Sequence, residues 1–132
     1  MIALDTNVLV RYLVEDDVRQ TALASALIKR AIASDDVLFV ADVVVCETVW
    51  VLSVSYDVPR TDIAGVLRKL FRARHLTFRA VDQLIRALEA YEVGKGDYAD
   101  YLIREQACAA ECDTVATFDR VLLRERGFVT VR

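Results

Sequence analysis

The sequence predicts an α/β fold with a central, mainly parallel sheet of four or five short strands flanked by helices on both faces. Short apolar runs alternate with longer stretches of helical periodicity, a pattern that favours right-handed crossovers between parallel strands. Only four glycines and one proline occur in 132 residues, so the chain should be rich in helix. The hydrophobic content of 55% and the charged content of 28% are typical of a globular chain.

The N-terminal half opens with the apolar run Met1 to Leu4, which predicts a first and central strand. Asp5 and Thr6 then predict a cap for a helix over residues 7–13. The acidic residues 15–17 form a polar connector. The pattern further predicts a helix over 21–32, a strand over 37–40, a helix over 43–56 capped by Asp42, a helix from 59 to 72, and a strand over 76–78.

The C-terminal half begins with a predicted helix over 81–92, with Leu84, Ile85 and Leu88 facing inward. The stretch 94–96, Gly-Lys-Gly, is the clearest break in the pattern. Beyond it we predict a helix over 97–111, a strand over 114–116, a short helix over 120–126 and a final strand over 128–131. No repeat, linker or low-complexity tract appears, so residues 1–132 are predicted to form one domain.

Composition limits the possible partners. The net charge of −3 does not favour binding to nucleic acid through bulk charge. Residues 63–81 nevertheless contain five basic side chains and no acidic one, which suits either a local phosphate-binding surface or a solvated helix face. These are Arg68, Lys69, Arg72, Arg74 and Arg79. No apolar run reaches the roughly eighteen residues of a membrane span, and no signal peptide is evident, so we expect a cytoplasmic protein without membrane contact.

The cysteines and the histidine exclude some chemistries. Cys46, Cys108 and Cys112 are an odd number, which argues against a disulfide framework. Cys108 and Cys112 are predicted to share a helix face, but no zinc-finger spacing occurs, and buried free cysteine is the commoner role. With His75 as the single histidine, a nucleophile activated by histidine is disfavoured.

Four acidic side chains carry the functional prediction: Asp5, Glu47, Asp100 and Asp119. Each lies beside or just after an apolar stretch, where a buried strand or helix begins or turns. The carboxyl ends of parallel strands converge on one crevice, so these side chains can meet in space. Two carboxylates about 4 Å apart repel by roughly 4 kcal/mol at an effective dielectric near 20, so a cluster must bind protons or a divalent cation.

Each acidic residue also has a simpler interpretation. Asp5 and Asp119 can serve as helix caps, and Asp97 after Gly96 is the better cap of the Asp97–Asp100 pair. Glu47 can lie on a narrow solvent-facing stripe, although its apolar neighbours favour a buried carboxylate that binds a cation. Thr117 offers a hydroxyl that can orient a water ligand. The recurrence of acids at one architectural position is what favours a shared site.

The chain resembles a PIN domain, and within that group the ribonuclease toxins of bacterial VapBC toxin–antitoxin modules. The matching segments are LDTNVLVRYLVEDD, ETVWVLSVSY, DYADYLIREQA and TFDR, which occur in the same order over nearly the whole chain. By this resemblance Asp5, Glu47, Asp100 and Asp119 are the catalytic and metal-binding acids. Asp97 is an additional acid that can bind metal, Asn7 is a usual neighbour of the first acid, and Thr117 is the polar residue beside the last.

The resemblance implies hydrolysis of RNA phosphodiester bonds that depends on Mg²⁺ or Mn²⁺, which suit carboxylate oxygens. It also implies a small antitoxin protein as partner, a homodimer and a larger toxin–antitoxin assembly. Apolar side chains available for such contacts include Trp50, Leu52, Tyr56, Leu67 and Phe71, which can equally be core residues. The alternative is a catalytically silent PIN-like module that binds RNA or protein. A phosphotransfer domain is disfavoured because Asn7 stands where a second aspartate is needed.

Overall fold

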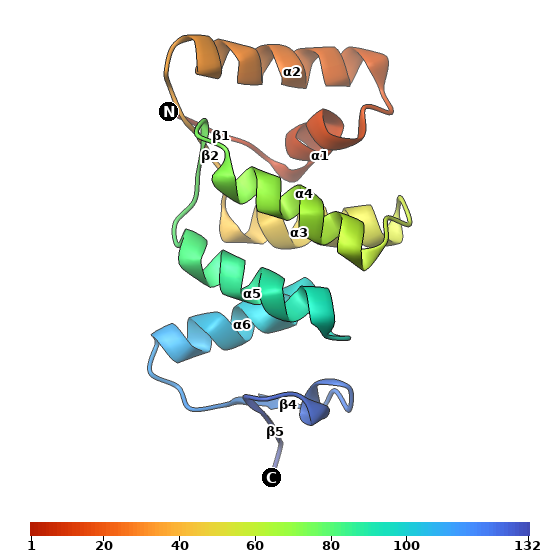
Figure 1. Ribbon diagram of the computed structural model, residues 1–132, viewed down its shortest axis with the longest axis vertical. Helices are drawn as coiled ribbons and strands as arrows, with labels where there is room; N and C mark the ends of the chain where they lie inside the picture. The colour runs from red at the N-terminus through yellow and green to blue at the C-terminus, as the bar shows by residue number, and fades with distance from the viewer. The chain divides into compact units, whose positions relative to one another are not determined.

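The computed structural model describes all 132 residues, which form two compact units (Figure 1). The first unit runs from Met1 to Arg79 and the second from Ala80 to Arg132, and each is described by itself. Both units contain helices and parallel strands, which confirms the predicted α/β class. None of the helices combines the length and the apolar character that a bilayer span requires.

The first unit contains a three-stranded parallel sheet and four helices. Its elements are β1 (Ile2–Ala3), α1 (Thr6–Val14), α2 (Val18–Ala33), β2 (Leu38–Phe39), α3 (Asp42–Val54), α4 (Arg60–Arg72) and β3 (Leu76–Thr77). The strand order is β1-β2-β3, and Leu38 pairs with both Ile2 and Leu76. Within this sheet β1 is an edge strand, whereas we predicted a central one. An apolar run identifies a strand but does not determine its neighbours.

The second unit packs α5 (Val81–Val93) against α6 (Tyr98–Ala109). It continues with β4 (Val115–Thr117), a 3₁₀ turn η1 (Leu122–Arg124) and β5 (Phe128–Thr130). The β4 and β5 strands form their own parallel pair, with Val115 opposite Phe128. The five strands are thus paired in two sheets, one in each unit. Tyr98 joins the two helices, because its hydroxyl donates to the Leu84 carbonyl at 2.8 Å.

Burial decides the structure of α3, whose valines are mediocre helix formers. Val45, Val49 and Leu52 are buried, which supplies the stabilisation that propensity does not. The other helices of this unit bury apolar side chains at helical spacing. These are Leu9 and Val10 in α1, Ala24 and Ile28 in α2, and Ile63 and Leu67 in α4.

Several element boundaries and caps differ from the prediction. Helix α2 begins at Val18, because the Asp17 side chain accepts from the Gln20 N–H at 2.9 Å and caps it a turn earlier. Asp42 lies inside α3 and does not cap it; its carboxylate instead accepts from Arg79 at 2.7 Å. The predicted helix over 120–126 shrinks to the 3₁₀ turn η1.

Some predicted side-chain environments are also wrong. On α5, Leu84 and Leu88 are buried as predicted, but Ile85 is 38% exposed. Helix α6 ends at Ala109, so Cys112 lies beyond it and does not share a helix face with Cys108. Both of these cysteines are exposed free thiols. Cys46 is partly buried, and burial raises the pKa of its thiol to about 11, which keeps it protonated and unreactive.

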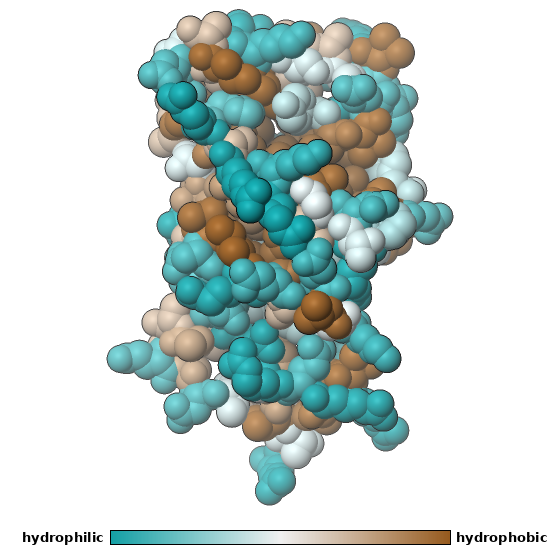
Figure 2. Space-filling view, viewed as in Figure 1, coloured by the Kyte–Doolittle hydropathy of each residue, from teal (hydrophilic) through white to brown (hydrophobic).

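One face of α3 exposes apolar side chains. Val43, Trp50 and Val54 are 62%, 60% and 58% exposed and lie at helical spacing, together with Glu47. Figure 2 shows separate hydrophobic patches on the otherwise hydrophilic surface of one side of the molecule. Of the other side chains predicted to be available for partner contacts, Leu52 and Leu67 are core residues. Phe71 packs edge-to-face against Phe78, with ring centroids 5.3 Å apart.

A charged cluster joins α1 to the end of α3. Arg11 donates to Asp16 at 2.8 Å, to the Tyr56 hydroxyl at 3.0 Å and to Gln20 at 2.7 Å. The Tyr56 hydroxyl donates to the second oxygen of Asp16 at 2.6 Å. This hydrogen bond from Tyr56, together with the charge of Arg11, lowers the pKa of Asp16. The cluster therefore stabilises the ionised form of Asp16 in the folded protein.

We expect Asp16→Asn to remove a small, pH-dependent part of the stability. A pKa that folding lowers means that ionised Asp16 stabilises the fold above the ordinary aspartate pKa, and this contribution is lost as the pH falls through the lowered pKa. Urea unfolding at several pH values measures the difference between wild type and variant, which should shrink toward acid pH. Asp57→Asn, at a site with φ 50° that asparagine tolerates, is the control. A difference that does not change with pH contradicts this interpretation.

The turn between α5 and α6 depends on glycine because neighbouring groups approach it closely. A Cβ at Gly94 would overlap the Tyr101 hydroxyl and lie 2.8 Å from the Ala90 carbonyl oxygen. A Cβ at Gly96 would lie 2.6 Å from Leu122. Tyr101 and Leu122 are both buried, so they have little room to move. These contacts fix the turn that leads into α6.

We therefore expect Gly94→Ala to lower the free energy of unfolding by about 1–3 kcal/mol, the usual range for overpacking. Gly65 is the matched control, since it lies inside α4 and a Cβ added there would have no neighbouring atom within 4 Å. Gly65→Ala should raise the free energy of unfolding by about 0.5–1 kcal/mol, because alanine favours the helix. Chemical denaturation measures both. Equal effects of the two substitutions would refute the close approach at Gly94.

Candidate functional site

Asp5 stands at the junction between β1 and α1. Its Oδ1 accepts from the Val8 N–H at 3.1 Å, which makes Asp5 the N-cap of α1. The next residue, Thr6, begins the helix and donates its hydroxyl to Oε1 of Glu47 at 2.9 Å. Thr6 therefore connects Asp5, which follows β1, with Glu47 on α3. The first unit brings Asp5 and Glu47 into one neighbourhood.

The environment of Glu47 differs from the predicted one. Its side chain is exposed, on the same face of α3 as Val43 and Trp50. The argument that a buried lone carboxylate requires a cation therefore does not apply to Glu47, and the solvent-facing alternative is correct. What distinguishes this residue is its hydrogen bond to Thr6, across 41 positions of sequence.

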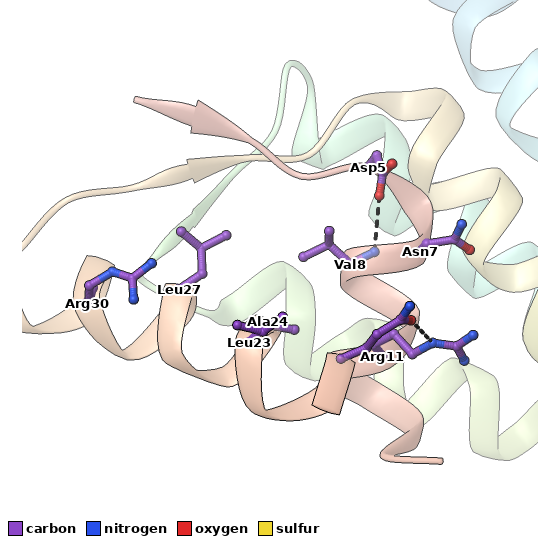
Figure 3. A pocket seen from close by; sticks show the side chains of 9 residues that line it. Asp5, Asn7, Val8, Arg11, Leu23, Ala24, Leu27 and Arg30 are labelled. Atoms are coloured by element: carbon purple, nitrogen blue, oxygen red, sulfur yellow. Dashed lines mark hydrogen bonds between the residues drawn. The ribbon is translucent and has the colours of Figure 1, made fainter. Parts of the chain in front are cut away.

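A groove of about 450 Å³ opens beside Asp5, between α1 and α2. Figure 3 shows Val8 of α1 and Leu27 of α2 pointing into this space, with Asp5 at one end. The remaining lining residues are Asn7, Arg11, Gln20, Leu23, Ala24 and Arg30. Asn7 is exposed in the first turn of α1, two residues after Asp5. The groove has an apolar floor and polar ends.

In the second unit, Asp97 and Asp100 form a capping box at the start of α6. Asp97 is the N-cap, as predicted, and its N–H donates to Oδ2 of Asp100 at 3.1 Å. Asp100 lies in the first turn of the helix and is partly buried. The capping box fixes the position of Asp100 relative to Asp97.

Asp119 occupies a tight turn after β4. Its N–H donates to the hydroxyl oxygen of Thr117 at 3.0 Å, and its Oδ1 accepts from the Val121 N–H at 2.9 Å. Asp119 therefore organises the turn that precedes η1. Thr117 accepts this bond through its oxygen and retains its own hydroxyl hydrogen as a donor.

The second unit gathers negative charge around Asp100. Burial raises the pKa of Asp100, and the negative charges of Asp97, Asp119 and Glu125 raise it further, against the opposing hydrogen bond from the Asp97 N–H. Repulsion of this kind is relieved when a cation binds. Glu125 was not among the predicted site residues, because residues 120–126 were predicted as a short helix, whereas Glu125 ends the 3₁₀ turn η1 in an extended conformation.

One feature is shared by the four acidic side chains that carry the functional prediction, which are Asp5, Glu47, Asp100 and Asp119. Each uses one carboxylate oxygen in a hydrogen bond within the protein and has no protein partner at the other oxygen. Such side chains are held in place yet offer a single oxygen as a ligand, and Mg²⁺ binds oxygen ligands of this kind while keeping several waters. The donor set therefore fits a hard divalent cation. Neither unit by itself brings together three acidic, histidine or cysteine side chains that could hold a metal ion.

The fold and these residues define an α/β protein that presents carboxylates where parallel strands end and helices begin, the usual place for ligands in such folds. Residues 2–128 match the PIN domain family over both units, so the chain belongs to that family. PIN domains are typically nucleases, which supports a hydrolase of the nuclease type. None of the curated proteins matches the chain.

Proposed function

We propose that the protein is a Mg²⁺-dependent endoribonuclease. Asp5, Glu47, Asp100 and Asp119 would hold the ion, with Asp97 as an additional acid. The observation that supports this most strongly is the pairing of one fixed and one free oxygen in each of the four carboxylates, in a chain of the PIN family. Mn²⁺ suits the same oxygen ligands.

The protein side chains would bind the cation and orient the substrate. When bound at these carboxylates, a divalent ion would supply an activated water and charge stabilisation at the scissile phosphate. The Thr117 hydroxyl donates toward a water or a phosphate oxygen, since its acceptor side is already used by the Asp119 N–H. The amide of Asn7, two residues after Asp5, offers a second donor. No step needs a protein nucleophile.

RNA cleavage by the purified protein tests this function. A labelled single-stranded RNA should be cut internally in the presence of Mg²⁺ or Mn²⁺, and EDTA should stop the reaction. Restoring Mg²⁺ in excess of EDTA should restore cleavage, which controls for damage to the protein. RNA that is bound without any Mg²⁺-dependent product would instead identify a catalytically silent binding module.

We further propose that this nuclease is the toxin of a type II toxin–antitoxin module, as the resemblance to VapBC toxins suggests. The exposed apolar face of α3, formed by Val43, Trp50 and Val54, supports contact with a second copy or with a small antitoxin. Expression should arrest bacterial growth, and co-expression of the protein encoded beside it should relieve the arrest. A monomer of unchanged size with and without that partner would contradict the proposal.

A further inference from the structure

We propose that Lys95, Arg120 and Arg124 form a pocket in the second unit that binds a backbone phosphate of the RNA strand. This inference rests on the proposed nuclease function and adds a substrate-binding site to it. The pocket has a volume of about 500 Å³. It is lined by Val93, Gly94, Lys95, Arg120, Val121, Arg124 and Glu125.

A buried tyrosine holds the two walls of this pocket together. One wall is the glycine turn that carries Lys95, and the other is the segment around η1 that carries both arginines. The Tyr101 hydroxyl accepts from the Gly96 N–H at 2.9 Å and donates to the Glu125 carboxylate at 2.5 Å. Tyr101 is completely buried, and Gly94 lies so close to its hydroxyl that the Tyr101 side chain has little room to move. The pocket is therefore preformed in the protein without a ligand.

The three cations of the pocket are not neutralised by the protein. No ion pair joins Lys95, Arg120 or Arg124 to any carboxylate, although Glu125 lies in the same pocket. Other arginines of the second unit behave differently: Arg86 pairs with Asp82 and Glu105. With three cations and one carboxylate, the pocket carries two excess positive charges. An anion is the ligand that such a pocket favours.

The location of the pocket identifies the anion as part of the substrate. Lys95 precedes Asp97 by two residues, and Arg120 directly follows Asp119. Tyr101, the residue directly after Asp100, donates its hydroxyl to Glu125, which lines the pocket, so the pocket adjoins the acidic residues of this unit. Repelling carboxylates next to a cationic pocket suit a polyanion that has one phosphate at the acids and a neighbouring phosphate at the cations. A single RNA strand has this arrangement of charges.

The salt dependence of RNA binding tests the pocket directly. Fluorescence anisotropy of a short labelled single-stranded RNA, measured in EDTA over a range of KCl concentrations, gives the slope of log affinity against log salt. Each phosphate contact contributes about −0.7 to this slope for single strands. Arg120→Gln and Arg124→Gln should each make the slope less steep by about 0.7, and the double variant by about 1.4. Affinity should fall to a similar degree for RNAs of different sequence.

Arg126→Gln is the matched control. Arg126 lies in the same segment and carries the same charge, but it lines a different pocket. Its substitution should leave the slope unchanged. Slopes for Arg120→Gln and Arg124→Gln equal to that of Arg126→Gln would overturn the proposal, as would a wild-type protein that binds no RNA in EDTA. Inorganic phosphate that binds through Arg120 and Arg124, while RNA binding does not depend on these two residues, would assign the pocket to a free phosphate and overturn the strand assignment.

The nuclease proposal and the pocket can fail separately. A protein that shows the expected slope changes but never cuts RNA with Mg²⁺ retains the pocket and loses the nuclease function. A protein that cuts RNA with Mg²⁺, and whose slope is insensitive to Arg120 and Arg124, retains the function and loses the pocket.

Discussion

Asp100→Asn should reduce the rate of Mg²⁺-dependent RNA cleavage about a thousandfold, since metal-ion stabilisation of a transition state is worth several kcal/mol and each 1.4 kcal/mol or so is tenfold in rate. Asparagine retains an oxygen that can accept from the Asp97 N–H, so the capping box should survive. The variant loses the ionised ligand and keeps the start of α6. Single-turnover cleavage at saturating RNA measures the loss.

The same variant should not be less stable than the wild type in EDTA. Burial and the charges of Asp97, Asp119 and Glu125 raise the pKa of Asp100, so its ionisation destabilises the fold as the pH rises through that pKa. Asparagine removes this effect at neutral pH. Mg²⁺ should raise the melting temperature of the wild type by mass action and not that of the variant. Asp82→Asn, in the first turn of α5, is the control and should respond to Mg²⁺ like the wild type.

Asp5→Asn should lower the cleavage rate by about a hundredfold to a thousandfold for the same reason, the loss of an ionised oxygen ligand. Asparagine is as good an N-cap as aspartate, so α1 and its Val8 contact should remain. The control is Asp17→Asn, because Asp17 caps α2 in the same way, with its side chain accepting from the Gln20 N–H at 2.9 Å. Circular dichroism should be unchanged in both variants, and only Asp5→Asn should lose activity.

An Asp5→Asn protein that cleaves RNA at the wild-type rate would limit Asp5 to a capping role. Equal losses in Asp5→Asn and Asp17→Asn would point instead to a general effect of weakened helix caps. Comparing the two variants distinguishes these outcomes, because Asp5 and Asp17 make similar cap hydrogen bonds. Only Asp5 is followed by a residue, Thr6, that donates a hydrogen bond to Glu47.

Local patterns in the sequence predicted most of the element types, with the short helix over 120–126 as the exception. Apolar runs identified β1, β2 and β3, and capping residues placed the starts of α1 and α6 at Asp5 and Asp97. Where a prediction failed, the deciding interaction was in some cases distant in sequence. Arg79 binds Asp42 from 37 positions away, so Asp42 was mistaken for a cap.

The candidate site shows the same limit. Asp5, Asp97, Asp100 and Asp119 could be chosen from the sequence because each follows a strand or begins a helix. The exposure of Glu47 could not be predicted from the sequence, because apolar neighbours on a helix do not reveal which face of the helix is covered. Tyr101 and Glu125 also escaped notice, because their hydrogen bond spans 24 positions and ends in an irregular segment.

Binding of Mn²⁺ by wild type, Asp5→Asn, Asp100→Asn and the double variant, measured by calorimetry, tests most directly whether these carboxylates hold one divalent ion. Each single substitution should weaken Mn²⁺ binding at least about tenfold, and the double variant should lose less than the sum of the two, because both side chains then serve the same ion. Mn²⁺ affinity in both single variants equal to that of the wild type would contradict the metal-dependent mechanism.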